Sequence, residues 1–269
     1  ETAGIENAQV DVELLVGHVL EISRGQVQSN LISDARIDED KLKQLNDLFG
    51  RRFAREPLQH LTGLAYFRQL ELEVGRGVFV PRPETESVVQ LAIDALKASE
   101  LAEPIAVDLG TGSGAIALAL KHSRPDAHVT AVDASTDALD VAQANAARLQ
   151  LTVTFHHGSW LAPVAGHVFD AIVSNPPYVA ADDAHLAALK HEPLSALASG
   201  PDGLDDIRLI VRQAGAHLKP GGWLLLEHGF DQAHAVQTLL SNQGFVNVQS
   251  RPDLAGILRC SGGQWPTVK

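Results

Sequence analysis

The feature that most limits what this chain can fold into is a regular alternation of short apolar runs with helical segments, starting near residue 104. The apolar runs predict strands at residues 105–109, 128–133, 152–156, 169–174, 222–227, 245–250 and 256–260. Helices are predicted at residues 87–99, 115–122, 136–149, 204–218 and 231–242. Alternating strands and helices form a mostly parallel sheet covered on both faces, whereas the last two strands lack an intervening helix and should pair antiparallel.

The loop after the first strand is the first candidate binding site. In open parallel sheets, ligands bind beyond the carboxyl ends of the strands, where the strand order reverses. The loop offers five candidates for cofactor contact: Gly110, Thr111, Gly112, Ser113 and Gly114. Its third glycine comes one residue earlier than in the dinucleotide fingerprint, so the loop alone is a weak indication of a ligand.

Two acidic residues strengthen that indication. Asp133 ends the second strand, where a carboxylate can accept both ribose hydroxyls of an adenosine. Asp108 lies near the end of the first strand beside the loop and can receive an ammonium group. A site for a ribose and an amino group, without a pyrophosphate, fits S-adenosylmethionine better than NAD. The structural alternative is that both aspartates cap helices.

The fourth strand is followed by Asn175-Pro176-Pro177-Tyr178. Two consecutive prolines cannot donate to a β-ladder, so the strand must end there. They also stiffen the exit and hold Asn175 and Tyr178 on a rigid corner suited to a planar polar group. The alternative is a plain turn, because Asn-Pro is a common turn signal. Residues 179–203 form either a surface excursion or part of a substrate channel, and their position directly after the motif favours the channel.

The first part of the chain is predicted to be helical. Residues 1–62 place apolar side chains at helical spacing, and one helix is expected to begin after Asp38. Three arginines near the end of that helix, Arg51, Arg52 and Arg55, match its negative pole on a solvated face. The alternative is that they form a docking surface for an acidic or RNA-bearing partner.

A β-hairpin and a stiff segment are expected to follow. Alternation at residues 67–74 predicts one half-exposed strand, and Gly75 and Gly77 allow the chain to turn back. Two prolines then make the chain extended, and Glu84 or Thr85 can cap the next helix.

Composition argues against several classes of function. A net charge of −12 argues against broad, non-specific binding to nucleic acid, which needs clustered positive charge. The single cysteine, Cys260, cannot form an internal disulfide and suits a reducing compartment. No apolar run is long enough to span a bilayer, and no signal peptide is expected. The 12 histidines form no cluster at ligand spacing, so we expect no metal site.

Together, the glycine loop, Asp133 and the Asn-Pro-Pro-Tyr motif resemble the class I S-adenosylmethionine-dependent methyltransferases. The motif is typical of enzymes that methylate a planar nitrogen, in adenine, cytosine or a glutamine amide. Further stretches resemble one branch, the release-factor glutamine methyltransferases (HemK/PrmC-like): residues 55–63, 79–86, 192–204, 227–232 and 253–256.

The resemblance implies a Rossmann-like methyltransferase sheet with an antiparallel last strand. Its expected parts are a helical docking domain at 1–62, a β-hairpin and linker at 63–86, and an S-adenosylmethionine-dependent methyltransferase domain at 87–269. The implied cofactor is S-adenosyl-L-methionine, which becomes S-adenosyl-L-homocysteine. The implied substrate is the glutamine of the Gly-Gly-Gln tripeptide in class 1 peptide chain release factors. We expect a cytoplasmic monomer that binds neither membranes nor nucleic acid directly.

The resemblance also implies roles for single residues. Asp108, the glycine loop, Asp133 and Asn175 correspond to cofactor-binding positions, and Trp160 stands where the family places an aromatic residue against the adenine. Ser159 is a departure, because the family often has an aspartate there that accepts from the adenine amino group.

The chemistry assigned to the motif follows from the weak nucleophilicity of an amide nitrogen. We predict that the side-chain carbonyl of Asn175 and the backbone carbonyl of Pro176 accept the two amide N–H bonds and orient the nitrogen lone pair. Tyr178 should pack on the flat face of the amide, beside Pro177. Two alternatives stay open: an adenine or cytosine amino methyltransferase acting on nucleic acid, and a non-catalytic binding module with the same fold.

Overall fold

The computed structural model describes residues 5, 7–33 and 36–267. It divides into two compact units: Glu1–Leu64 with Val74–Arg76, and Ala65–Glu73 with Gly77–Lys269. The predicted hairpin and linker are therefore shared between the units. The outermost residues of the predicted domains, 1–4, 6 and 268–269, and residues 34–35 lie outside the described part of the chain.

The first unit contains four helices within its described residues: α1 (Ala8–Leu20), α2 (Arg24–Ile32), α3 (Glu39–Phe53) and α4 (Leu58–Thr62). Asp38 caps α3 as expected, because its carboxylate accepts from Lys41 N at 2.8 Å. A small core forms around Leu15, Val27 and Leu45. Helix α2 was not predicted, although its start is marked in the sequence by the capping box of Ser23 and Gln26.

Two of the three arginines at the end of α3 are held by acidic side chains of the same unit. Arg51 forms two hydrogen bonds, of 2.7 and 2.9 Å, to the buried carboxylate of Glu56. The hydrogen bond from Arg51 lowers the pKa of Glu56 to about 2. Arg52 donates to Asp11 at 2.7 Å. These pairs hold α3 to its neighbours, a role beyond the expected match to the helix dipole.

The hairpin differs from its prediction. Residues 67–74 do not form one strand, because β1 (Leu64–Phe67) and β2 (Leu70–Glu73) are separated by a turn at Arg68. Arg68 adopts a φ of 53° there, and its backbone N–H donates to Glu86 at 2.9 Å. Gly75 and Gly77 come after the hairpin rather than within it, and residues 78–80 form no strand.

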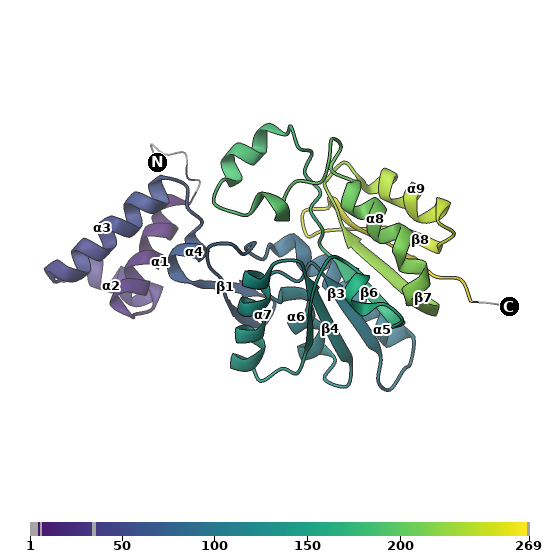
Figure 1. Ribbon diagram of the computed structural model, residues 1–269. Coiled ribbons are helices and arrows are strands. Elements are labelled where there is room, and N and C mark those ends of the chain that lie inside the picture. Colours follow the sequence, from purple (N-terminus) through teal and green to yellow (C-terminus); the bar gives the residue numbers. More distant parts are fainter. Residues whose placement is uncertain (1–4, 6, 34–35, 268–269) are drawn as a thin grey trace. The chain divides into compact units, whose positions relative to one another are not determined.

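The second unit contains, in its described residues, a seven-stranded sheet in the order β5-β4-β3-β6-β7-β9-β8 (Figure 1). Its strands are β3 (Ile105–Leu109), β4 (His128–Asp133), β5 (Thr154–His157), β6 (Phe169–Ser174), β7 (Leu218–Glu227), β8 (Val246–Pro252) and β9 (Leu258–Gln264). The strands β3 to β7 are parallel to one another, whereas β9 is antiparallel to both β7 and β8. The predicted mostly parallel sheet is confirmed. Its order reverses between β3 and β6.

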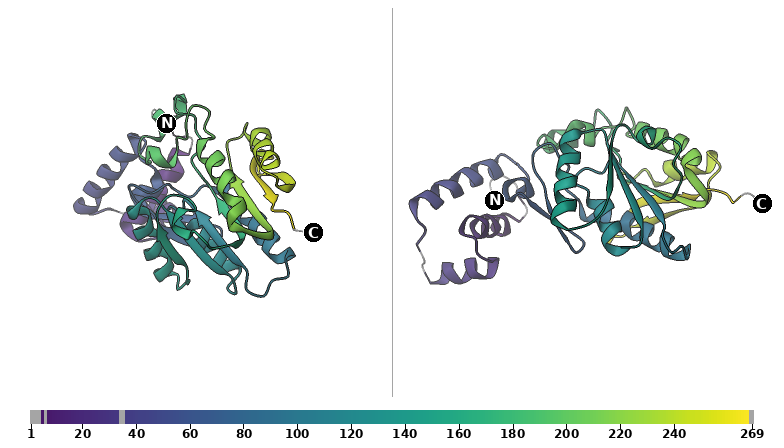
Figure 2. Two further views of the ribbon diagram at one scale, coloured as in Figure 1. Left: turned by 45° about the vertical axis from the view of Figure 1, so that its right-hand side comes forward. Right: turned by 60° about the horizontal axis from the view of Figure 1, so that its bottom comes forward.

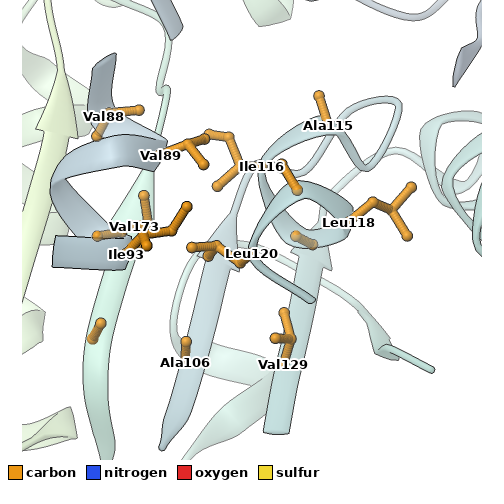
Figure 3. Packing of buried hydrophobic residues seen from close by; sticks show 14 of the residues in the cluster. Val88, Val89, Ile93, Ala106, Ala115, Ile116, Leu118, Leu120, Val129 and Val173 are labelled. Atoms are coloured by element: carbon orange, nitrogen blue, oxygen red, sulfur yellow. The ribbon is translucent and has the colours of Figure 1, made fainter. Parts of the chain in front are cut away.

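Helices cover both faces of this sheet (Figures 1 and 2). They are α5 (Glu86–Ala98), α6 (Ala115–Ser123) and α7 (Thr136–Arg148) on one face, and α8 (Asp205–Ala214) and α9 (Ala233–Asn242) on the other. Figure 3 shows Val89, Ile116 and Leu120 from α5 and α6 close to Val173 of β6 and Ala106 of β3. The predicted helix at 204–218 ends early, and its last turn is the 3-10 segment η5 (Gly215–His217).

The start of α5 has no side-chain cap, which differs from the prediction. The hydroxyl of Thr85 makes no capping hydrogen bond, although Thr85 is the residue before the helix. Thr85 ends the 3-10 segment η1 (Pro83–Thr85), and its buried side chain is used elsewhere. Ser135 caps the start of α7, where its side-chain oxygen accepts from Ala138 N at 3.2 Å.

Candidate active site

A cavity of about 890 Å³ lies at the carboxyl ends of β3, β4 and β6 in the second unit. It is lined by the glycine loop, by residues after β4 and β5, by the Asn-Pro-Pro-Tyr motif, and by two segments from outside the sheet, at residues 77–85 and 189–197. The site residues predicted from the sequence that line it are Gly110, Thr111, Gly112, Ser113, Asp133, Trp160, Asn175, Pro176, Pro177 and Tyr178. Among the described residues, seven separate stretches of sequence, Asp206 of α8 included, thus meet at the point where the strand order reverses.

The glycine loop turns tightly beneath this cavity. Gly110, Gly112 and Gly114 have φ values of +70°, +57° and +85°, which side chains disfavour. The loop is fastened to the next strand, because the backbone N–H groups of Gly110 and Thr111 donate to Val132 O at 2.8 and 3.0 Å. The loop therefore presents backbone rather than side chains to the cavity.

Asp108 supports the loop from below. It is fully buried, and its Oδ2 accepts from the Thr111 hydroxyl at 2.6 Å and from Ala117 N at 3.1 Å. Burial raises the pKa of its carboxyl to about 7. Asp108 and Gly114, although predicted as cofactor contacts, are not among the described residues that line the cavity. The hydrogen bond from Ala117 N gives Asp108 the helix-capping contact that is the alternative, and its role toward the cofactor stays a prediction.

Asp133 lines the cavity with two of its acceptor sites already used. Its Oδ2 accepts from Gly112 N and its Oδ1 from Ser135 N, each at 2.8 Å. A carboxylate has about four acceptor sites, so roughly two remain for hydroxyl groups of a ligand. These backbone contacts also fix the direction in which the carboxylate faces.

Trp160 packs against the loop from a different strand end. It has a φ of 48°, and its ring lies so close to Gly110 that a Cβ atom there would meet Cζ3 at 3.3 Å. Ser159, its neighbour, also lines the cavity. A flat aromatic wall therefore stands beside the glycine loop.

The Asn-Pro-Pro-Tyr motif forms the opposite wall. Its prolines are buried, and the preceding Ser174 donates to Leu109 O at 2.6 Å, which ties the end of β6 to the end of β3. The side-chain amide of Asn175 donates through Nδ2 to the hydroxyl of Thr85 at 3.1 Å. This contact leaves Oδ1 available to accept a hydrogen bond from a ligand.

Behind Tyr178 lies a buried carboxyl that the sequence reasoning missed. The Tyr178 hydroxyl donates to Glu227 Oε1 at 3.2 Å, and Glu227 is 1% exposed at the end of β7. Burial raises the pKa of Glu227 to about 7, whereas the hydroxyls of Thr85 and Tyr178 act in the opposite direction. Burial and Glu227 together raise the pKa of Tyr178, so its hydroxyl stays protonated. Glu227 could have been found from the sequence, because it is a polar residue at the carboxyl end of a central strand.

The stretch at 179–203 is fastened to the edge of the cavity. Glu192, which is buried, accepts from Val80 N at 3.4 Å and forms an ion pair with Arg82. Val179 N donates to Leu197 O at 2.9 Å. Residues of this stretch line the cavity, as its interpretation as part of a substrate channel requires.

Comparison with known proteins identifies the family of this chain. The model of the PrmC N-terminal domain matches residues 1–63, and that of the methyltransferase small domain matches residues 71–198. The chain is 45% identical to the release factor glutamine methyltransferase of Burkholderia pseudomallei, over 96% of this chain and 92% of that protein. It is 40% identical to the one of Coxiella burnetii, over 93% and 90%. This chain belongs to the release factor glutamine methyltransferase family.

Solved structures agree with the fold of this family. The Thermus thermophilus 16S rRNA N2 G1207 methyltransferase, solved with AdoMet and guanosine, has a TM-score of 0.56 and 20% identity, covering 75% of this chain and 49% of that one. The hMettl16 catalytic domain has a TM-score of 0.58 and 13% identity, covering 74% and 75%. At these identities the likeness shows the shared methyltransferase fold alone.

One other sequence feature lies away from the site. Gly262, Gly263 and Gln264, which repeat the tripeptide of the implied substrate, lie within strand β9 beside β7, so the match is coincidental. No group of three or more potential metal ligands occurs among the described residues. In the part of the chain that the structure describes, no helix has the length and apolar character needed to cross a membrane.

Proposed function

We propose that this protein transfers a methyl group from S-adenosyl-L-methionine to the side-chain amide nitrogen of a glutamine, the one in the Gly-Gly-Gln motif of class 1 peptide chain release factors. The observation that supports this most strongly is the placement of Asn175 Oδ1 beside the rigid Pro176 in the cavity that also contains the glycine loop and Asp133. The substrate is supported by the names of the relatives. The enzyme acts in the cytoplasm as a monomer.

The residues present fit the proposed cofactor. Because Gly110 has no side chain, the indole of Trp160 packs close to the loop and lines the cavity, where a flat adenine can lie beside it. Asp133 has acceptor capacity for the two ribose hydroxyls, and the glycine loop lines the cavity beside it. When bound, S-adenosylmethionine supplies a sulfonium methyl group that is already a strong electrophile. No metal ligand set is needed for this chemistry.

The opposite wall aligns the acceptor. The Asn175 side-chain carbonyl and the Pro176 backbone carbonyl accept the two N–H bonds of the substrate amide, which turns the nitrogen lone pair toward the methyl group. As the nitrogen–carbon bond forms, the methyl–sulfur bond breaks with its electron pair left on sulfur, positive charge develops on the nitrogen, and the same carbonyl dipoles stabilise that charge. One N–H proton is then lost to water. Tyr178, neutral and held by Glu227, covers the flat face of the amide.

Mass spectrometry of a Gly-Gly-Gln peptide and of an intact release factor, each incubated with enzyme and cofactor, tests this function. We expect a methyl group on the glutamine, with the intact factor methylated faster if the helical first unit contributes to docking. Nucleic acid is incubated in parallel with radiolabelled cofactor. Label on nucleic acid and none on either protein substrate would overturn the proposal.

A further inference from the structure

The proposed grip on the substrate requires that Asn175 present its oxygen, and not its nitrogen, to the cavity. The two ends of an asparagine side chain have nearly the same shape, so packing does not distinguish them. Only a hydrogen-bond partner can fix the orientation. Within the described residues, the partner of Asn175 Nδ2 is the hydroxyl of Thr85, at 3.1 Å.

A threonine hydroxyl alone cannot enforce this choice. It has one proton to donate and two lone pairs that accept, so it can pair equally well with either end of the asparagine. The choice is made only if another group takes the hydroxyl proton. Thr85 is 3% exposed, so bulk water does not supply that group.

Glu227 is placed to take the proton. The hydroxyl of Thr85 lies close enough to Glu227 to lower the pKa of its carboxyl, and an ionised carboxylate accepts but never donates. The buried Oε2 atom of Glu227 has no hydrogen-bond partner among the described residues, so the carboxyl has room for a second donor beside Tyr178. Once the Thr85 proton points to Glu227, only lone pairs face Asn175, and Nδ2 must turn toward Thr85.

We propose that Thr85 and Glu227 are positioning residues that set the amide orientation of Asn175, with Glu227 fixing at the same time the hydroxyl of Tyr178. The inference rests on the proposed function, because it concerns how that site grips an NH₂ group. The proposal gives a role to Thr85, which the sequence predicted as a helix cap. It also gives a role to Glu227, whose carboxyl does not line the cavity.

The charge on Glu227 decides whether the arrangement holds. A protonated Glu227 can donate to Thr85, and the hydroxyl is then free to donate to Asn175 and favour the reversed amide. The charged and titratable groups around Glu227 come from three elements: Glu84 of η1, Tyr178 after β6, and Arg259 and Cys260 of β9. Glu84 and burial disfavour the carboxylate, whereas Arg259 and the two hydroxyl donors favour it.

Kinetics of Thr85→Val, Thr85→Ser and Glu227→Gln test the proposal. Valine keeps the shape of threonine but cannot hydrogen-bond, so kcat should fall on the order of tenfold to a hundredfold with little change in cofactor affinity. Serine restores the hydroxyl and should restore most of kcat. Glu227→Gln can donate to Thr85, so it should lower kcat and remove the acid limb of the pH–rate profile. Thr238→Val on α9 and the exposed Glu103→Gln serve as matched controls.

A measurement without substrate separates this inference from the proposed function. The side-chain amide signal of Asn175, assigned by its loss in Asn175→Ala, should shift as pH changes near neutrality in the wild type and stay constant in Glu227→Gln. If methylation fails but this titration is seen, only the proposed function is wrong. A signal that does not titrate in the wild type, or a Thr85→Val enzyme with wild-type kcat, would overturn the role of the two residues.

Discussion

The two walls of the cavity are built by different means. The glycine loop and Asp133 are fixed by backbone hydrogen bonds between neighbours in sequence or in the sheet. The Asn175 wall depends on side chains that are far away in sequence, because Thr85 is 90 residues and Glu227 52 residues from the asparagine. The first wall is therefore insensitive to most distant substitutions, whereas the second can be misaligned without any change in its own motif.

The largest expected effect separates chemistry from cofactor binding. Asn175→Ala should lower kcat on the order of a thousandfold, because it removes one of two carbonyl dipoles that align and stabilise the reacting amide. Cofactor affinity, measured by calorimetric titration, should change little, since the opposite wall is intact. A wild-type rate in this variant would show that the two walls are not divided in this way.

Each wall also rests on one buried carboxyl, and their pH dependences can be compared. The pKa values of Asp108 and Glu227 are raised to about 7 from ordinary values of 3.8 and 4.5. A raised pKa means that the folded state disfavours the ionised form. Each group therefore stabilises the fold fully below its unfolded pKa, and that contribution is lost as pH rises toward 7.

Asp108→Asn and Glu227→Gln remove these ionisations one at a time. Between about pH 4 and 7, the free energy of unfolding of each variant should fall by roughly 3 kcal/mol less than that of the wild type. Urea unfolding at pH 4.5 and pH 8 measures the difference, with exposed Glu103→Gln as the control. Curves parallel to the wild type would mean that the carboxyl concerned is solvated in the folded protein.

The complementary test is a substitution in the wall formed by the glycine loop and Asp133. Asp133→Asn keeps an acceptor for Gly112 N but removes the charge, so cofactor should bind on the order of tenfold to a hundredfold more weakly. At saturating cofactor kcat should be close to the wild-type value. Asp137→Asn, an exposed neighbour on α7, is the matched control. A loss confined to kcat would remove the distinction between the walls.

The same contrast explains what the sequence could predict. Strands at 105–109, 128–133 and 169–174 were predicted to the residue, because buried parallel strands are continuous apolar runs with sharp ends. The loop and Asp133 were found because glycines and a strand-end acid are local signals. The corner at Asn175 was found for the same reason.

Long-range hydrogen bonds left no such signal. Thr85 looked like a cap because it precedes a helix, and only the folded chain brings its hydroxyl to Asn175. The hairpin turn was misplaced because Gly75 and Gly77 suggested a turn that Arg68 makes with a positive φ. The substrate class came from resemblance, since the motif itself accepts any planar NH₂ group.

The smallest expected effect tests how closely the glycine loop approaches Trp160. Gly110→Ala and Gly244→Ala both place a side chain at a positive φ, +70° and +95°, which costs on the order of 1 kcal/mol in stability. A Cβ at Gly244 meets no atom within 4 Å, whereas one at Gly110 meets Trp160 at 3.3 Å. Both variants should therefore lose similar stability in thermal unfolding, but only Gly110→Ala should weaken cofactor binding. Equal cofactor affinities would mean that the indole moves aside freely, and that this wall is less rigid than its backbone hydrogen bonds imply.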